Sequence, residues 1–353
     1  MKSNIASSAN INLHPAVLAL GLKYADGSIR GANSRCKAML QAFRQVINDY
    51  TFPLPSNGKT KDFRHDLENR ILKPSFTFWT TECRIHSVTM GNAFTFLKIS
   101  VAKLDRDLKL EEVKNTLNEC IEVYIEERID FADKAICKHA ESKITDGDVI
   151  LTYAKNDLIQ MLLSNINNAT DEENKKNFRV ILVDSRPLLE GKEMMKKLAN
   201  AGIECTYILL NSLSYVMKEV TKVFLGASAL MSNGSILSRV GTASVALMAS
   251  SHNVPVLVCC ETYKISNRVQ LESITGNELG DPDGFNSLSK SANKDRNAGR
   301  ESLRLLNLLY DLTPSEFVSG IVTEMGILPP TSVAVLLREM NPQESGFKED
   351  DIC

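Results

Sequence analysis

The chain has 353 residues, of which 43% are hydrophobic and 24% are charged, and its formal net charge is -2. This length suits about two globular domains, and the near-balance of charge excludes a bulk attraction to nucleic acid or to anionic membranes. The sequence has no leader-like amino end and no apolar run long enough to cross a bilayer, so we expect no membrane partner, no direct nucleic-acid partner and a cytoplasmic location.

Residues 14–145 are predicted to form a helical domain after a flexible start at residues 1–13. Apolar residues recur there at spacings of three and four, as at Leu97 and Val101, which is the spacing of one buried helix face. The longest such pattern covers residues 111–143 and carries charges on its opposite face. It predicts a long amphipathic helix.

Residues 146–340 are predicted to form a doubly wound, Rossmann-like α/β domain. Short apolar runs rich in β-branched residues alternate with helical patterns, which indicates a parallel sheet with crossover helices. The runs are apolar at nearly every position, as expected for strands that helices cover on both faces. The predicted core strands are 149–153, 179–183, 204–210, 222–225 and 254–259.

The carboxyl-terminal part of this domain is more polar. A stretch at residues 277–300, rich in Asn, Asp, Ser and Lys, is predicted to be a surface loop. A short helix over residues 303–310 and a final strand over residues 333–337 are expected to close the domain. Residues 341–353 are charged and are predicted to be a flexible tail. The predicted fold class is therefore α/β, with an amino-terminal helical domain followed by a Rossmann-like parallel-sheet domain.

The turns after the strands are the places to look for chemistry, because ligands of doubly wound sheets bind beyond the carboxyl ends of the strands. The first turn, from Ala154 to Asp157, lacks the glycines of a dinucleotide site, and the chain contains no P-loop, so we expect no nucleotide cofactor. Eight cysteines form no C-x-x-C pair and five histidines lie far apart. These spacings predict no metal site.

Arg186 stands directly after the second predicted core strand, beside a helix start with a proline in its first turn. This arrangement suits a carboxylate or phosphate ligand. The alternative is that Arg186 forms an ion pair with Asp184 or another nearby acid, since many such pairs are structural. The sequence leaves both interpretations open.

Arg239 precedes Gly241 and Thr242, which open a predicted helix over residues 243–251. We expect Thr242 to cap that helix while Arg239 reaches toward an anion at its amino end. The alternative is a capped helix that serves only as a subunit contact. Caps are common, so the pattern does not decide between the two.

Three stretches carry a specific resemblance: V-D-S-R-P-L-L-E-G at 183–191, L-G-A-S-A-L-M-S-N-G-S-I-L-S-R-V-G-T at 225–242 and N-V-P-V-L-V-C-C-E-T-Y-K at 253–264. They resemble the family that unites the alpha, beta and delta subunits of translation initiation factor 2B with sugar-phosphate aldose-ketose isomerases. Within it, N-E-L-G-D-P-D at 277–283 and L-L-N-L-L-Y-D-L-T-P at 305–314 are similar to the delta subunits. The resemblance covers nearly the whole chain, but the long polar amino-terminal extension of delta subunits has no counterpart, which implies a short form or a trimmed chain.

The resemblance implies a pocket without its catalysts. The isomerases move a proton with a cysteine after the first core strand and an aspartate in a G-A-D motif, a task that needs an acid and a base. The matching positions here are Ala154 and Ser228, which do not exchange protons near neutral pH. We therefore expect no enzymatic activity and no catalytic residue. The residues that match the family's sugar-phosphate pocket are Arg186, Asn233, Arg239, Gly241 and Thr242.

The resemblance also implies a function and partners. The chain is expected to be a non-catalytic regulatory subunit of the guanine-nucleotide exchange factor for initiation factor 2, with a beta-like subunit as its most direct partner and alpha, gamma and epsilon subunits in the same assembly. Leu306 and Leu308 are expected at the subunit interface.

Initiation factor 2, especially with a phosphorylated alpha subunit, is expected to contact the helical domain at Glu127 and Phe131. The alternative for these two residues is a solvated charge and a buried aromatic ring. The alternative function is a sugar-phosphate isomerase, or a sugar-phosphate sensor, on the same fold.

Overall fold

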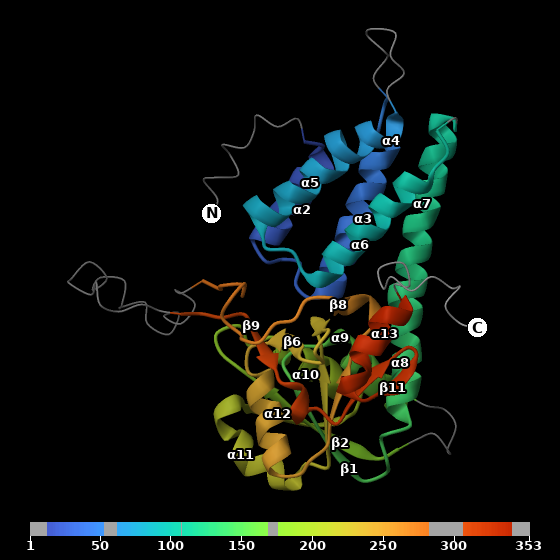
Figure 1. The fold of residues 1–353 in the computed structure, drawn as a ribbon. Helices are drawn as coiled ribbons and strands as arrows, with labels where there is room; N and C mark the ends of the chain where they lie inside the picture. The colour runs from blue at the N-terminus through green and yellow to red at the C-terminus, as the bar shows by residue number, and fades with distance from the viewer. Residues whose placement is uncertain (1–12, 53–61, 107, 169–175, 282–305, 341–353) are drawn as a thin grey trace, which may run out of the picture. The chain divides into compact units, whose positions relative to one another are not determined.

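The chain folds into two compact units, Met1–Phe131 and Ala132–Cys353. The computed structural model in Figure 1 describes residues 13–52, 62–106, 108–168, 176–281 and 306–340. The first unit is helical and the second contains a mainly parallel sheet, which confirms the predicted fold class. Most of the predicted flexible start, the predicted tail and most of the predicted loop lie outside the described residues. Within the described part of the chain, every helix is too short or too polar to span a bilayer.

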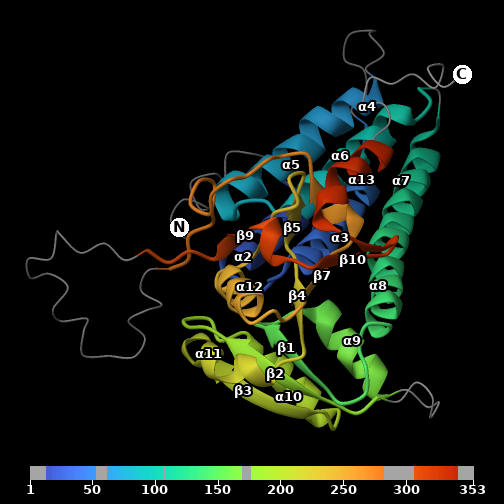
Figure 2. The ribbon, with the colours of Figure 1, turned by 60° about the horizontal axis from the view of Figure 1, so that its bottom comes forward.

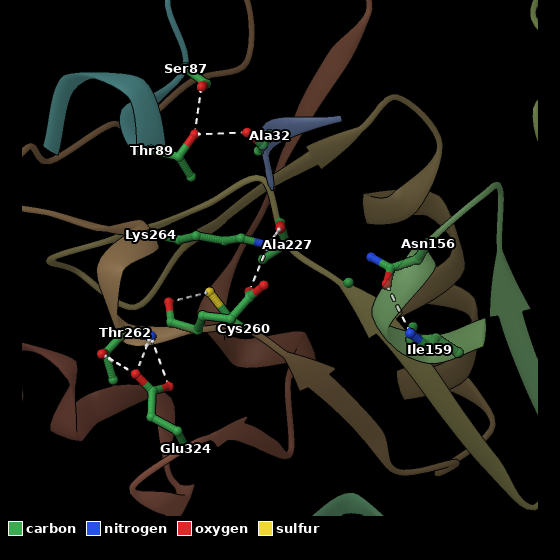
Figure 3. Close-up of polar contacts among 12 residues, drawn as sticks. Ala32, Ser87, Thr89, Asn156, Ile159, Ala227, Cys260, Thr262, Lys264 and Glu324 are labelled. Carbon is green, nitrogen blue, oxygen red and sulfur yellow. Dashed lines mark hydrogen bonds and ion pairs between the residues drawn. The ribbon is translucent and has the colours of Figure 1, made fainter. Parts of the chain in front are cut away.

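The helical unit packs around one tryptophan. Trp79 is fully buried, lies edge-on to Phe43 with ring centroids 5.0 Å apart, and donates a hydrogen bond to the carbonyl of Val17 at 2.8 Å. Figure 3 shows the Thr89 hydroxyl joining α6 to the Ala32 carbonyl at the start of α3, at 3.2 Å. The helices are α2 (Pro15–Ala25), α3 (Ala32–Asn48), α4 (Phe63–Asp66), α5 (Lys73–Thr77), α6 (Val88–Lys103) and α7 (Leu110–Ile125), with π-helical turns at Leu67–Leu72, Phe78–Cys83 and Glu126–Phe131.

The predicted helix over residues 111–143 is found as consecutive helical segments. Residues of α7 are followed by the π-helical turn Glu126–Phe131 and then by α8 (Ala132–Glu141). The predicted domain boundary at residues 145 and 146 follows the change in hydrophobic period. The two compact units divide at residues 131 and 132 instead, because α8 packs on α9 and β10 of the α/β unit.

The main sheet has seven strands in the order β11-β10-β7-β4-β1-β2-β3. Neighbouring strands are parallel except for β10 and β11. Ile150 on β1 is in register with Val180 on β2 and with Lys222 on β4, so β1 is an interior strand between these two. The strands are β1 (Asp148–Tyr153), β2 (Phe178–Asp184), β3 (Glu204–Leu209), β4 (Lys222–Gly226), β7 (Val256–Cys259), β10 (Gly320–Thr323) and β11 (Gly326–Leu328).

Helices cover both faces of this sheet, which explains why its strands are apolar throughout. Leu151 packs in one core with residues of α11 (Leu213–Val216), α12 (Thr242–Ser251) and α13 (Val333–Met340). Its neighbour Ile150 packs in a second core with residues of α8, α9 (Asp157–Asn167) and α10 (Gly191–Asn200). Successive side chains of a strand point to opposite faces, so each strand contributes to both cores.

A second sheet, which the sequence did not predict, has four strands in the order β8-β5-β6-β9. These strands are β8 (Ile265–Ser266), β5 (Ala229–Met231), β6 (Ile236–Arg239) and β9 (Tyr310–Thr313). Strand β9 lies beside α12, as Figure 2 shows. The prediction of a helix over residues 303–310 is wrong for the described residues. Leu308 forms an isolated antiparallel β-bridge with Leu279, and Tyr310 is the first residue of β9. Pairing with distant segments overrides the local helical spacing.

The strand predicted over residues 333–337 is also wrong, because these residues begin helix α13. Two valines and two leucines suggested a strand by their β-branched and apolar character. Val333 and Leu336 are buried and Val335 is 54% exposed, which is a helical spacing rather than an alternating one. Strands β10 and β11 close this edge of the sheet instead.

Candidate functional site

The strand order places a potential ligand edge between β1 and β4. From β1, the next strands β2 and β3 are added on one side, whereas β4, β7 and β10 are added on the other side, so the order of the parallel strands reverses at β1. In such sheets ligands bind beyond the carboxyl ends of the strands at this reversal. The segments that reach it are the turns after β1, β2 and β4.

The crevice after β1 and β4 is filled by a side chain of the protein. Asn156 follows β1 and caps helix α9, because its Oδ1 accepts a hydrogen bond from the backbone N–H of Ile159 at 3.0 Å (Figure 3). Gly226 ends β4 where a Cβ atom would overlap the amide group of Asn156. The glycine therefore allows Asn156 to occupy the space between the two strand ends.

A buried ion pair lies at the same edge of the sheet. Lys264 and Glu261 follow β7, are 5% and 0% exposed, and lie 2.6 Å apart. The Lys264 amine also donates to the carbonyl of Ala227, just after β4, at 3.2 Å (Figure 3). Burial lowers the pKa of Lys264, but the adjacent Glu261 carboxylate together with other neighbouring groups outweighs this effect, and the net pKa is raised. The contacts of Lys264 with Glu261 and with the Ala227 carbonyl fasten the end of β7 to the end of β4.

A small cavity remains beside the ends of β1 and β2. Its free space is about 20 Å³, which holds about one water molecule. A sugar phosphate does not fit in that space. The lining residues are Tyr153, Ala154, Asp184, Ser185, Arg186, Pro187, Leu188, Glu190, Arg239, Val240, Asn307, Leu308 and Leu309.

The two predicted arginines meet in this cavity but differ in their contacts. Arg239 is 17% exposed and its Nη2 donates to Glu190 Oε1 at 2.7 Å. The guanidinium also lies 5.3 Å from the ring centroid of Tyr310. Arg186 is exposed and forms no ion pair with any described residue. Its predicted alternative partner, Asp184, instead accepts hydrogen bonds from the Ser185 N–H and the Tyr207 hydroxyl, both at 2.9 Å.

The amino end of α12 is closed by a carboxylate that the sequence analysis missed. Asp311 Oδ2 accepts the backbone N–H groups of Gly241 at 2.6 Å and Ala243 at 3.0 Å. Burial raises the pKa of Asp311 to about 6, against the lowering effect of these hydrogen bonds. Thr242 does not cap the helix through its side chain, because its hydroxyl donates to the Arg239 carbonyl at 2.6 Å. An external anion at this helix end would have to compete with Asp311.

Gly241 is needed for this arrangement. Its φ of 107° lies in the region that L side chains rarely adopt, and a Cβ atom would overlap the Tyr153 hydroxyl. That hydroxyl lies within hydrogen-bond distance of Ser185 Oγ, at 2.7 Å, and of the Val240 carbonyl. Burial raises the pKa of Tyr153 to about 12, so the hydroxyl stays protonated near neutral pH.

Asn233 and the two positions that match the family's catalysts are not all at the cavity. Asn233 is exposed in the turn between β5 and β6, where its side chain donates to the Gln270 carbonyl at 3.2 Å and accepts the Ser235 N–H. It does not line the cavity. Ala154 lines the cavity, whereas Ser228 lies outside it, and its backbone N–H donates to the Leu237 carbonyl.

No thiol is available to replace the missing catalyst among the described residues. The cavity lining contains no cysteine. Cys259 and Cys260, at the end of β7, are buried, and burial raises the pKa of both thiols. A protonated, buried thiol is a poor nucleophile. Within the described residues, no three His, Cys, Asp or Glu side chains are grouped so as to hold a metal ion.

Three of the four predicted partner residues are exposed. Phe131 is 51% exposed and Glu127 is exposed, both on the π-helical turn after α7. Leu306 is 59% exposed, whereas Leu308 is half-buried and lines the cavity. Exposure of large apolar side chains is typical of contact surfaces.

Glu190 and Asp311 are the site residues that sequence reasoning missed. Both lie in motifs that carry the family resemblance: Glu190 in V-D-S-R-P-L-L-E-G and Asp311 in L-L-N-L-L-Y-D-L-T-P. Their partners lie 49 and 70 residues away along the chain. The sequence did show an acidic residue in each motif, and it showed Arg239 and Gly241 as groups that need an acceptor. It did not show which acid meets which donor.

Known proteins resemble the chain in sequence and fold. The model described as Initiation factor 2 subunit family matches residues 28–330. The chain is 44% identical over 332 residues to "Translation initiation factor eIF2B subunit delta" of Dictyostelium discoideum, covering 93% of the chain and 51% of that relative. The chain thus spans about half the length of this relative. It is 28% identical to "Ribose 1,5-bisphosphate isomerase" of Pyrococcus furiosus, covering 92% of the chain and 93% of the relative.

A solved structure has the same fold. A chain of the tetrameric eIF2B-beta2-delta2 complex from C. thermophilum superposes with a TM-score of 0.77 and 34% sequence identity. The match covers 90% of this chain and 93% of that chain. Fold and sequence therefore agree over nearly all of the chain.

Proposed function

Because the chain belongs to the initiation factor 2 subunit family, we propose that it acts as a non-catalytic regulatory subunit of the guanine-nucleotide exchange factor for translation initiation factor 2. In this proposal exchange is catalysed by another subunit, and the chain works in the cytoplasm. Its partners are a beta-like subunit most directly, alpha, gamma and epsilon subunits in the same assembly, and initiation factor 2, especially with a phosphorylated alpha subunit.

The closed ligand edge of the main sheet is the observation that carries this proposal. Asn156 and the Lys264–Glu261 pair fill the strand ends, and the remaining cavity holds about one water molecule. Ala154 and Ser228 supply neither an acid nor a base. An isomerase needs both a pocket for its substrate and a proton-transfer pair. The geometry therefore favours a scaffold over the isomerase alternative.

An exposed apolar strip in the α/β unit supports subunit docking. The strip is held to strand β9, because Asn277 Nδ2 donates to the Tyr310 carbonyl at 2.6 Å and Ser273 Oγ accepts the Leu312 N–H at 3.0 Å. Its side chains are 59–86% exposed, and a group of exposed large apolar side chains, unlike a single one, is typical of an interaction site. We assign this strip to the beta-like subunit. Its members are Val269, Leu271, Ile274, Leu279 and Leu306.

An acidic face on α7 and its π-helical turn supports docking of initiation factor 2. Glu119, Glu126 and Glu127 are exposed and have no ion-pair partner among the described residues. Val123 and Phe131, 42% and 51% exposed, lie on the same segment. Carboxylates beside apolar side chains suit a partner surface that is basic around an apolar centre. Since like charges repel, a phosphate on the partner would lie away from these carboxylates.

Purification of the tagged full-length chain from cells tests the proposal. We expect the other exchange-factor subunits to elute with it, and Leu271→Glu with Leu306→Glu to remove the beta-like subunit, because two charges would be buried at the contact. Leu22→Glu is the matched control, since Leu22 is 54% exposed on α2, outside the strip. A wild-type chain that elutes alone as a monomer would contradict the proposal.

A further inference from the structure

The cavity beside β1 and β2 contains an anion supplied by the chain. Glu190 and Arg239 are 13% and 17% exposed and their charged groups lie 2.7 Å apart. A charge-assisted hydrogen bond that is largely withdrawn from water is strong, because solvent screens it little. Arg239 is thus bound by an internal carboxylate at the place where an external oxyanion would bind.

Arg239 retains an unused donor. Its Nη1 atom is buried and has no hydrogen-bond partner. Glu190 Oε1 accepts a hydrogen bond from Nη2 and leaves Nη1 of the same guanidinium without an acceptor. Arg186 lies in the same lining and has no ion pair with a described residue. A tetrahedral oxyanion, with several acceptor oxygens, would satisfy more of these donors than Glu190 does.

Space is the second constraint. About 20 Å³ is free, which is enough for water but too little for a phosphate group while Glu190 is in place. Glu190 immediately precedes α10, and its side chain makes no capping hydrogen bond to that helix. Movement of the carboxylate would therefore break no capping hydrogen bond of α10.

We propose that Glu190 is a built-in occupant of this anion site: its carboxylate holds Arg239 and keeps the cavity closed to inorganic phosphate and to the phosphate group of a larger ligand. Among the charged residues of the lining, Arg186 and Arg239 are balanced by Asp184 and Glu190. Removal of the Glu190 charge frees Arg239 and leaves the lining with net positive charge, which attracts an oxyanion.

Substitution of Glu190 by glutamine tests this proposal in the full-length chain. Glu190→Gln keeps the shape but not the charge. Inorganic phosphate, compared with chloride at matched ionic strength, is expected to raise the Tm of this variant by about 2 °C once it is in roughly tenfold excess over its Kd. The Tm of the wild-type chain is expected to stay constant, and Arg239→Met combined with Glu190→Gln is expected to abolish the shift.

Glu193→Gln is the matched control, because Glu193 lies on α10, is 57% exposed and pairs with Lys155 and Lys197 outside the cavity. A sugar monophosphate tested in parallel separates two outcomes. A shift with inorganic phosphate alone means that the opened cavity accepts only a small oxyanion, whereas a shift with both means that the neighbouring turn also moves; either supports a site closed by Glu190.

Two results overturn the proposal. The first is an equal phosphate-dependent shift in the wild-type chain, since Glu190 would then not bar the site. The second is the absence of any shift in a folded Glu190→Gln chain. Should this variant not fold, Glu190→Asp retains the charge and withdraws the carboxylate by one methylene group. It is expected to show a smaller shift than that given above, and no shift in it would equally reject the proposal.

Discussion

The carboxyl edge of the main sheet and the exposed face of α7 handle charge in opposite ways. At the sheet edge, Lys264 is paired with Glu261 and Arg239 with Glu190, and both pairs are largely buried. On α7 and its π-helical turn, Glu119, Glu126 and Glu127 are exposed without ion-pair partners in the described part of the chain. Charges that the fold neutralises serve its stability, whereas exposed and unneutralised charges are available to a partner.

The largest expected effect comes from breaking the buried pair at the sheet edge. Lys264→Met leaves the fully buried Glu261 carboxylate without its counter-charge, which is expected to lower the free energy of unfolding by about 4 kcal/mol. Urea denaturation measures this loss. Lys197→Met, which removes an exposed pair with Glu193 on α10, is the control and is expected to cost about 0.5 kcal/mol. Similar losses in the two variants would contradict the contrast between edge and surface.

The next effect concerns the carboxylate that closes α12. Since burial raises the pKa of Asp311 to about 6, the folded chain binds this proton more tightly than the unfolded chain. The stabilisation from protonation is complete below the unfolded pKa and is lost as the pH rises through about 6. Asp311→Asn removes the titration, so the free energy of unfolding of the variant relative to wild type is expected to rise with pH by on the order of 3 kcal/mol. Denaturant unfolding at several pH values measures this difference; a difference that stays constant with pH would contradict it.

A smaller loss is expected where Asn156 fills the strand ends. Gly226→Ala places a methyl group on the Asn156 amide and displaces the cap of α9, which is expected to lower the free energy of unfolding by about 2 kcal/mol. Gly91→Ala on α6 is the control, because its methyl group meets His86 only at ordinary contact distance and alanine favours a helix. Thermal unfolding of both variants measures the loss. If Gly226→Ala is as stable as the wild-type chain, the crevice is open and the account is contradicted.

The sequence predicted the core of the fold because its signals are local. Apolar runs identified β1, β2, β3, β4 and β7 within one or two residues at most ends. The strands of the second sheet have two to four residues, and β8 and β9 pair with β5 and β6 from far away along the chain. Such short strands carry no periodicity, so the helix predicted over residues 303–310 extends into Tyr310, the first residue of β9. The strand predicted over residues 333–337 fails for another reason, because β-branched and apolar residue types outweigh the helical spacing of α13.

The candidate site was predictable only in part for the same reason. The rule that ligands bind beyond the strand ends directed attention to Arg186 and Arg239, and the structure places both in one cavity. Asn233 was carried over from the family pattern and lies outside that cavity. The closure of the site by Glu190 and Asp311 could not be predicted, because it depends on which of many acids the folded chain brings within hydrogen-bond distance.

The smallest expected effect tests the proposed role most directly. Glu127→Lys reverses one exposed charge of the acidic face, which is expected to weaken the contact with initiation factor 2 carrying a phosphorylated alpha subunit about fivefold, or about 1 kcal/mol. Glu339→Lys, the same change on the exposed surface of α13, is the control. In a reconstituted exchange assay, the account predicts weaker inhibition by the phosphorylated partner for Glu127→Lys, with basal exchange unchanged. Inhibition equal to that of the wild-type and control assemblies would contradict it.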